Sequence, residues 1–272
     1  MSFYEKLAKV WIKNDSLLCV GLDSDLDRIP AHLRTEKNPL FSFNCQIIDA
    51  TVDLVCAYKP QIAYYAAQNA RKELELTLEY LRDKHAEIPV ILDAKRGDIV
   101  PTAKMFAREA FELYKADAVT VNPFMGGDTL KPFFDWKEKG TIVICRTSNP
   151  GSKEFQDLEV IGGGKIYKII AKRAAEDWNV NKNVALVVGA NHPEELKEIR
   201  EIVGDMPLLV PGVGAQEADI RAAVLAGLDS RGAGMIINSS RKIIYAGSGK
   251  DFAAQARAAA RKLRDDINRH RA

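Results

Sequence analysis

The chain has 272 residues, of which 47% are hydrophobic and 28% are charged, and these are the proportions of a globular protein. Its 39 Lys and Arg residues nearly balance its 37 Asp and Glu residues, which leaves a formal net charge of +2. This balance excludes a strong electrostatic case for nucleic acid or a membrane surface as the main partner. A single α/β barrel has about 250 residues, so we expect one domain over residues 1–272.

The cysteines and the N-terminal segment indicate the compartment. The four cysteines are widely spaced, without a C-x-x-C motif, and they are Cys19, Cys45, Cys56 and Cys145. Such cysteines are typical of a reduced protein in which they pack as small hydrophobes. The first residues, MSFYEKLAKVWIKN, have apolar positions at helical spacing and no signal-peptide core. No apolar run reaches the roughly 18 residues of a membrane span, so we expect a cytoplasmic protein.

Eight short apolar runs, rich in β-branched residues, follow one another along the chain. They cover residues 17–22, 54–62, 89–94, 118–121, 141–145, 184–188, 207–210 and 234–238. Each run is a nearly continuous hydrophobic stretch, which is the pattern of parallel strands that are covered on both faces.

The longer segments between these runs have the pattern of helices. Residues 102–115 place apolar side chains among charges, and residues 193–203 follow Asn191 as an expected N-cap and end at Gly204. Strict alternation of strands and helices fits a closed barrel or a doubly wound open sheet. Eight roughly even units favour an α/β protein with a (β/α)8 TIM barrel and with extra N-terminal and C-terminal helices, the last over residues 253–271. The 149–165 loop is the one long insertion, and it fits either a lid or a plain connection.

Charged residues gather at the predicted carboxyl ends of the first three strands. Asp93 and Lys95 are two positions apart in ILDAKRGD, so their side chains point to one face of the strand. In a barrel that face is the interior, at the end where active sites lie. Asp23 ends the first strand, Lys59 lies in the second, and Asp98 follows the third.

Nearby carboxylates favour the protonated form of a lysine, which then serves as a positioned proton donor. An ion pair that only closes the barrel mouth is the alternative reading of Asp93 and Lys95. The further charges at equivalent places weaken that alternative.

A second group of residues follows the predicted seventh and eighth strands, where barrels often bind phosphate. PGVGAQ, which ends at Gln216, is a glycine-bearing loop whose amides can approach an anion. NSSR, which ends at Arg241, offers hydroxyls and a guanidinium fork. A tight turn with a surface arginine is the alternative reading.

Two other patterns carry no function. Gly247-Ser-Gly-Lys250 lacks the spacing and the preceding strand of a nucleotide-binding P-loop. The four histidines are scattered along the chain, so we expect no metal site. No cofactor motif is present, and we expect no cofactor.

Seven motifs together resemble the orotidine 5'-phosphate decarboxylase family, and most of all its longer bacterial branch, type 2. In chain order they are VGLD, AYKP, LDAKRGDI, TVNPFMG, RTSNPGS, PGVGAQ and NSSR, and they span essentially the whole barrel. DAKRGDI followed by PGVGAQ is the most specific part. Val100-Pro101 departs from the small residues that this branch usually has there, but Thr102 keeps its place.

The resemblance implies decarboxylation of orotidine 5'-phosphate to UMP, the final step of pyrimidine biosynthesis, without a cofactor. It implies that Lys95 protonates C6 of the pyrimidine and is flanked by Asp93 and Asp98. The resemblance implies these further contacts: Asp23 and Lys59 with the ribose hydroxyls, Ser148 with the pyrimidine edge, and Gln216 and Arg241 with the phosphate. It also implies a homodimer with composite active sites, in which Asp98 and Thr102 enter the neighbouring subunit's site.

Three other functions stay open at this point. A metal-dependent sugar-phosphate decarboxylase would need a divalent metal. A Schiff-base aldolase would need a lysine without flanking carboxylates, which Lys95 is not. A catalytically inactive barrel that serves as a binding module would have no reason to keep the full set of charged residues.

Overall fold

A closed ring of parallel strands forms the centre of the molecule. The structure is a computed structural model that describes residues 1–212 and 217–271. The eight strands of the barrel are β1 (Leu18–Leu22), β2 (Ala57–Pro60), β3 (Ile91–Arg96), β4 (Ala118–Val121), β5 (Gly140–Arg146), β8 (Val184–Val188), β9 (Leu208–Pro211) and β10 (Met235–Ser239). They pair in the order β2-β1-β10-β9-β8-β5-β4-β3, and the parallel bridges Tyr58↔Val90 and Gln61↔Asp93 close the ring between β2 and β3. The predicted barrel is therefore confirmed, and the open sheet is excluded.

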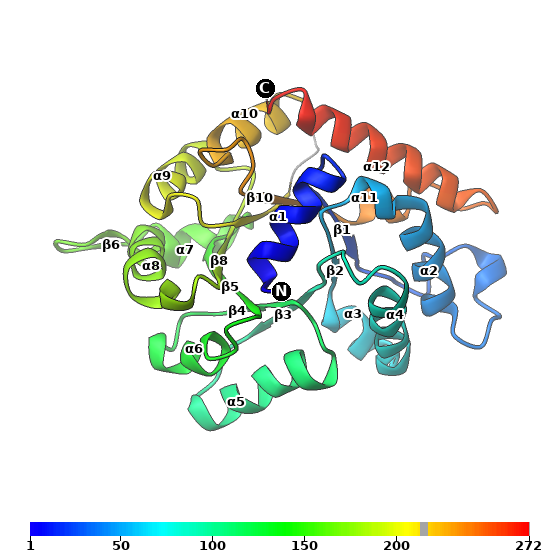
Figure 1. Cartoon of the computed structure of the whole chain (residues 1–272), viewed down its shortest axis with the longest axis horizontal. Coiled ribbons are helices and arrows are strands. Elements are labelled where there is room, and N and C mark those ends of the chain that lie inside the picture. Colours follow the sequence, from blue (N-terminus) through cyan, green and yellow to red (C-terminus); the bar gives the residue numbers. More distant parts are fainter. Residues whose placement is uncertain (213–216, 272) are drawn as a thin grey trace.

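Helices surround this ring (Figure 1). They are α1 (Phe3–Lys13), α2 (Pro39–Thr51), α3 (Ile62–Ala67), α4 (Arg71–Lys84), α5 (Val100–Arg108), α6 (Gly127–Phe134), α7 (Lys153–Gln156), α8 (Ile166–Arg173), α9 (Pro193–Val203), α10 (Glu217–Gly227), α11 (Arg241–Ile244) and α12 (Phe252–Asn268). Two π-helical turns, η3 (Glu109–Leu113) and η5 (Ala174–Trp178), extend α5 and α8, and the 3-10 turns are η1 (Ala31–Leu33), η2 (Val52–Leu54), η4 (Pro150–Ser152) and η6 (Asn179–Asn181).

The N-terminal helix α1 covers the amino-terminal end of the barrel and lies across its centre in Figure 1. Ser2 and Glu5 form a capping box that starts it, which stabilises a helix by about 1 kcal/mol. The amide of Phe3 donates to the carbonyl of Glu138, just before β5. Because α1 covers this end, the carboxyl ends of the strands form the accessible end of the barrel.

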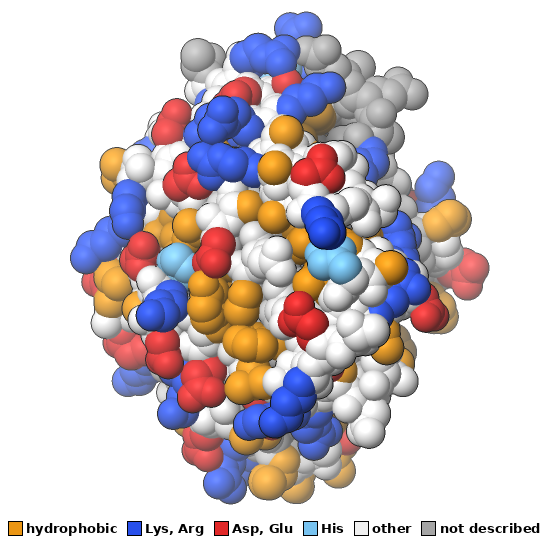
Figure 2. Space-filling model, turned by 90° about the vertical axis from the view of Figure 1, so that its right-hand side faces the viewer, with side chains coloured by type: hydrophobic (Ala, Val, Ile, Leu, Met, Phe, Trp, Pro, Cys, Tyr) orange, Lys and Arg blue, Asp and Glu red, His pale blue; other side chains and the backbone are white. Residues whose placement is uncertain are grey.

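The C-terminal helix α12 packs its buried side chains, including Phe252 and Ala256, against the barrel and α2. The other side of the helix carries charges, and Arg257 pairs with Asp53 at 2.5 Å. Figure 2 shows the side of the molecule that lies to the right in Figure 1. Basic and acidic side chains are interspersed over most of this face, as the near-neutral net charge predicts.

The predicted cap of α9 needs correction. The predicted cap Asn191 does not cap α9, because His192 occupies the N-cap position without a side-chain hydrogen bond, and the amide group of Asn191 donates instead to the carbonyl of Ser148. The long 149–165 insertion has short elements of secondary structure. It contains η4, α7 and a small antiparallel hairpin of β6 (Glu159–Val160) and β7 (Gly164–Lys165). This hairpin protrudes from the molecule toward the left of Figure 1.

Candidate active site

Four of the charged residues predicted from the sequence meet at the carboxyl end of the barrel. Asp23 follows β1 directly, Lys59 lies in β2, and Asp93 and Lys95 lie in β3. Parallel pairing sets Gly21 of β1 beside Lys59 and Gln61 beside Asp93. Neighbouring strands of one closed ring therefore bring these side chains into a single array.

Asp93 is the centre of this array. Its Oδ2 is 2.9 Å from Nζ of Lys59, and its Oδ1 is 2.6 Å from Nζ of Lys95. The side chains of Lys59 and Asp93 are only 6% and 8% exposed, whereas that of Lys95 is 46% exposed. Nζ of Lys59 also lies 4.0 Å from Oδ1 of Asp23. Charge thus alternates along the array, and Lys95 is its most exposed member.

Asp93 and Lys59 hold each other in their ionised forms. Burial alone would raise the pKa of Asp93, but the ammonium groups of Lys59 and Lys95 outweigh burial and hold this pKa well below its usual range. Burial would likewise lower the pKa of Lys59, but the carboxylates of Asp93 and Asp23 reverse the effect and raise it. An ammonium and a carboxylate therefore stay charged side by side at neutral pH.

Sequence reasoning missed Thr120, which completes the array from β4. Its Oγ1 donates to Oδ1 of Asp93 at 2.8 Å and accepts from the backbone amides of Ala94 and Lys95, both at 3.0 Å. Lys95 has a positive φ of 46°, a conformation that costs a non-glycine residue free energy, and the pairing of β3 with β4 shifts register here. The hydroxyl of Thr120 therefore holds the backbone of Lys95 and the carboxylate of Asp93 at once.

Neither Asp98 nor Thr102 forms a hydrogen bond or ion pair with a member of this array among the described residues. Oδ1 of Asp98 accepts from the amide of Ile99 at 2.7 Å, and among the described residues it makes no ion pair with Lys95. Thr102 lies in the first turn of α5 and is partly exposed. In the described part of one chain, Asp93 is the carboxylate that pairs with Lys95.

The predicted phosphate-binding residues follow β9 and β10. Arg241 is exposed and begins α11, and no hydrogen bond or ion pair holds its guanidinium among the described residues. The ends of β1 and β10 approach closely, because a Cβ at Gly21 would come within 1.9 Å of the hydroxyl oxygen of Ser240. Gln216 and the rest of the 213–216 segment lie outside the described residues.

Ser148 follows β5 at the same end of the barrel and is partly exposed. The α-carbons of Gly189 and Gly212 lie beside it, and a Cβ at Gly189 would come within 2.9 Å of Cβ of Ser148. The residues that follow β8 and β9 therefore pack closely around it.

Comparisons with known proteins agree with this geometry. The model of the "Orotidine 5'-phosphate decarboxylase / HUMPS family" matches residues 16–258. The orotidine 5'-phosphate decarboxylases of Azoarcus sp. and Cupriavidus taiwanensis are 54% and 55% identical over 271 residues, which cover 100% of this chain and 100% and 99% of theirs. The chain belongs to the orotidine 5'-phosphate decarboxylase / HUMPS family.

Solved structures of the family have the same fold. The Leishmania donovani OMP decarboxylase superposes with a TM-score of 0.85 at 37% identity, over 100% of this chain and 99% of that one. The family resemblance drawn from the sequence motifs is therefore confirmed.

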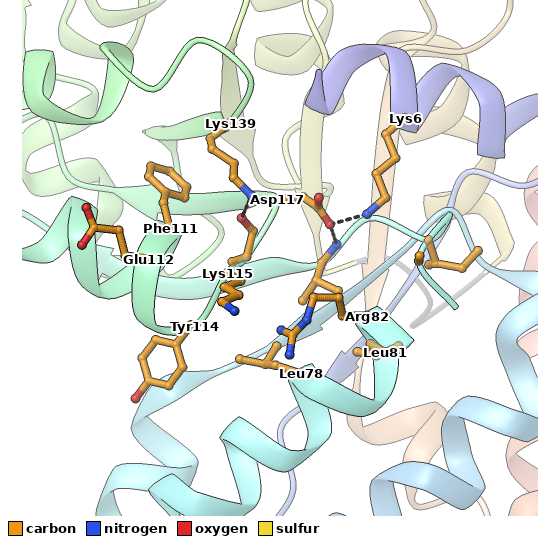
Figure 3. A pocket seen from close by; sticks show the side chains of 14 residues that line it. Lys6, Leu78, Leu81, Arg82, Phe111, Glu112, Tyr114, Lys115, Asp117 and Lys139 are labelled. Carbon is orange, nitrogen blue, oxygen red and sulfur yellow. Dashed lines mark hydrogen bonds and ion pairs between the residues drawn. The ribbon is translucent and has the colours of Figure 1, made fainter. Parts of the chain in front are cut away.

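A cavity of about 570 Å³ lies near the other end of the barrel (Figure 3). Lys6 of α1 pairs there with Asp117 at 2.7 Å, and Lys139 donates to the carbonyl of Ala116 at 2.7 Å. Asp117 comes just before β4, so the cavity lies at the amino-terminal ends of the strands. In barrel enzymes this end contributes to stability and the opposite end carries the chemistry, so we do not assign this cavity to the family's reaction.

Within residues 1–212 and 217–271, no group of three or more His, Cys, Asp or Glu side chains is placed to hold a metal ion. No helix in the described part of the chain is long and apolar enough to cross a membrane.

Proposed function

We propose that this chain decarboxylates orotidine 5'-phosphate to UMP, the final step of pyrimidine biosynthesis. Family membership over the full length supports the reaction. The Lys59–Asp93–Lys95 array is the observation that supports the proposed site most strongly. It places the exposed ammonium of Lys95 beside the buried carboxylate of Asp93 at the open end of the barrel.

Lys95 is the proposed proton donor. Loss of CO2 from C6 of the pyrimidine leaves a carbanion that the ring does not delocalise, and the reaction as we propose it uses no cofactor as an electron sink. An ammonium placed at C6 stabilises that charge electrostatically and then delivers a proton to the same carbon. Asp93 holds the ammonium group of Lys95 in place before the reaction, since Oδ1 of Asp93 is 2.6 Å from Nζ of Lys95.

The other residues bind the remainder of the nucleotide. Asp23 and Lys59 are proposed to contact the ribose hydroxyls, and Ser148 the edge of the pyrimidine. Gln216 and Arg241 are proposed to hold the phosphate. The guanidinium of Arg241 supports this role, because it is exposed and makes no hydrogen bond or ion pair within residues 1–212 and 217–271. The phosphate is remote from the bond that breaks, but its binding energy serves the transition state if it closes the site over the substrate.

The proposed active unit is a homodimer in which Asp98 and Thr102 complete the partner's site. Two features of the chain support it. Asp98 makes no ion pair with Lys95 of its own chain among the described residues. Large apolar side chains are exposed around it and on the neighbouring loop after β4, and they are Ile99 at 56%, Met105 at 58%, Phe124 at 85% and Met125 at 46% exposure. Such side chains are typical of a surface that another chain covers.

The alternative functions give different results in one assay. The absorbance of orotidine 5'-phosphate should fall in the presence of the purified protein, at the same rate with and without EDTA. A rate that EDTA abolishes and a divalent metal restores would indicate a metal-dependent decarboxylase. No turnover, combined with tight binding of UMP, would indicate a binding module.

The cytoplasmic location stays a prediction.

A further inference from the structure

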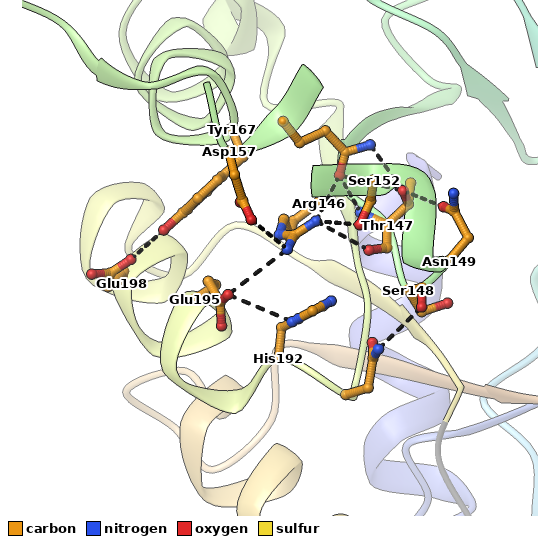
Figure 4. A network of polar contacts seen from close by, with 12 residues as sticks. Arg146, Thr147, Ser148, Asn149, Ser152, Asp157, Tyr167, His192, Glu195 and Glu198 are labelled. Atoms are coloured by element: carbon orange, nitrogen blue, oxygen red, sulfur yellow. Dashed lines mark hydrogen bonds and ion pairs between the residues drawn. The ribbon is translucent and has the colours of Figure 1, made fainter. Parts of the chain in front are cut away.

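A fully buried arginine lies at the end of β5. Arg146 is the last residue of that strand, and its side chain is 0% exposed. Burying a guanidinium costs several kcal/mol unless partners surround it. The polar contacts that surround Arg146 therefore show which segments it holds together (Figure 4).

Four of these contacts lie in the segment that follows at once, residues 147–157, and the longest of them runs from Nη1 to the carbonyl of Thr147 at 3.5 Å. Nη1 donates to Oγ of Ser152 at 2.5 Å and to Oε1 of Gln156 at 3.2 Å, and Nη2 donates to Oδ2 of Asp157 at 3.3 Å. One planar fork thus contacts the middle and the end of the segment.

The remaining contacts of Arg146 come from other elements. Oε1 of Glu195, in the first turn of α9, is 3.8 Å from Nη2. The ring of Tyr167, from α8, lies 5.9 Å from the guanidinium carbon. Arg146 therefore ties the 147–157 segment to the helices beside it.

The same segment is held at the point where Ser148 lies. Oε1 of Gln156 accepts from the amide of Thr147 at 2.8 Å, and Nε2 of Gln156 donates to the hydroxyl of Thr147 at 2.8 Å. On the other side, Nδ2 of Asn191 donates to the carbonyl of Ser148 at 3.0 Å. The backbone of Ser148 thus lies between two anchors, and Gln156 connects one of them to Arg146.

We propose that Arg146 is a positioning residue, which holds the 147–157 segment as a fixed wall of the active site and so sets Ser148 against the pyrimidine. This inference rests on the proposed function. Arg146 itself touches no substrate and acts through Gln156 and Thr147. The segment is then a preformed wall and not a lid that closes in each turnover.

The test compares three variants with the wild type, and the wild type itself tests the proposed function. Arg146→Lys keeps the charge but loses the planar fork, and Gln156→Leu cuts the connection to Thr147 while the charged pair with Asp157 stays. Arg200→Lys is the matched control. Arg200 is also a buried arginine, but its guanidinium donates to backbone carbonyls near the amino-terminal ends of β9 and β10, including those of Met206 and Gly234.

The expected kinetic result separates positioning from folding. A misplacement of about 1 Å costs up to about a hundredfold in rate, so kcat/KM of Arg146→Lys should fall about tenfold to a hundredfold, and that of Gln156→Leu about tenfold. The loss should be equal for the nucleotide and for the phosphate-free nucleoside, because the wall does not contact the phosphate. Arg200→Lys should lower Tm and leave kcat/KM unchanged.

Limited digestion with trypsin gives a second measurement, which does not depend on activity. Lys153 lies in the segment and is exposed, so cleavage after it should be faster in Arg146→Lys and Gln156→Leu than in the wild type or Arg200→Lys. Wild-type kinetics and wild-type cleavage in both segment variants would overturn the inference, and so would an equal kinetic loss in Arg200→Lys. If Arg146→Lys does not fold, Gln156→Leu decides. If the wild type does not turn over the nucleotide, the proposed function fails, and the cleavage rates still test the anchor.

Discussion

Replacement of Thr120 by valine tests the architecture of the array. The side chain is 1% exposed, and valine has nearly the same shape, so the change removes the hydroxyl and little else. It leaves the amides of Ala94 and Lys95 without their partner and takes one donor from Asp93.

The magnitude follows from these three hydrogen bonds. A buried polar group left without a partner costs about 1–3 kcal/mol. Because Ala94 is only partly buried and Lys95 is exposed, water reaches part of this site, and we expect a loss of about 2–4 kcal/mol in the free energy of unfolding. Lys95 also loses the contact that fixes its backbone, so kcat should fall about tenfold to a hundredfold.

Denaturation in urea measures the stability, and the fall in absorbance of orotidine 5'-phosphate measures kcat. Thr120→Ser keeps the hydroxyl and should recover most of both. Thr141→Val is the matched control, because Thr141 is 0% exposed in the neighbouring strand and its hydroxyl has no hydrogen-bond partner among the described residues. If Thr120→Val behaved like Thr141→Val in both measurements, the reasoning about Thr120 would be refuted.

Three further predictions concern the phosphate, the subunits and pH. Arg241→Ala should lower kcat/KM for the nucleotide by about tenfold or more, as expected for loss of one charged hydrogen bond, and scarcely change it for the nucleoside; equal losses would assign Arg241 to the fold. A mixture of the inactive variants Lys95→Ala and Asp98→Ala should regain about a quarter of wild-type activity per site once subunits exchange, since half of the dimers are mixed and each of these has one intact site of two. A mixture that stays inactive despite confirmed exchange would place Asp98 in its own chain's site. The pKa of Asp93 in the folded protein lies below its value of about 3.9 in the unfolded chain. The ionised Asp93 carboxylate therefore contributes its full stabilisation above about pH 4, and this stabilisation is lost as the pH falls through the pKa of the folded state. The difference in unfolding free energy between the wild type and Asp93→Asn should therefore shrink below about pH 4, and a difference that stays constant down to pH 2 would contradict the ionised pair.

The strands were predictable because their signal is simple. Parallel strands covered on both faces must be apolar along their whole length, and the predicted runs 118–121 and 184–188 coincide with β4 and β8. The order of strands around the ring then sets Asp23, Lys59 and Asp93 side by side. Their meeting was predictable from the fold because strand ends in a barrel share one rim.

The missing parts of the site depend on contacts that no local pattern encodes. Thr120 lies in an otherwise apolar strand, and β-branched threonine is common in strands for its shape alone. The positive φ of Lys95 occurs where its amide donates to that hydroxyl, and this contact between strands was equally hidden in the sequence. Asn191 had the composition of a cap, but tertiary contact with Ser148 took its side chain. Arg146 looked like one charged residue of a motif, and only the folded chain shows that it is fully buried.

The central claim is that Lys95 performs the chemistry at C6, and one comparison tests it most directly. Turnover of orotidine 5'-phosphate and binding of UMP are measured side by side for the wild type and for Lys95→Ala. The variant should still bind UMP but lose decarboxylation. Turnover within about tenfold of the wild type, roughly 1.4 kcal/mol in the barrier, would remove Lys95 from the mechanism and contradict the account.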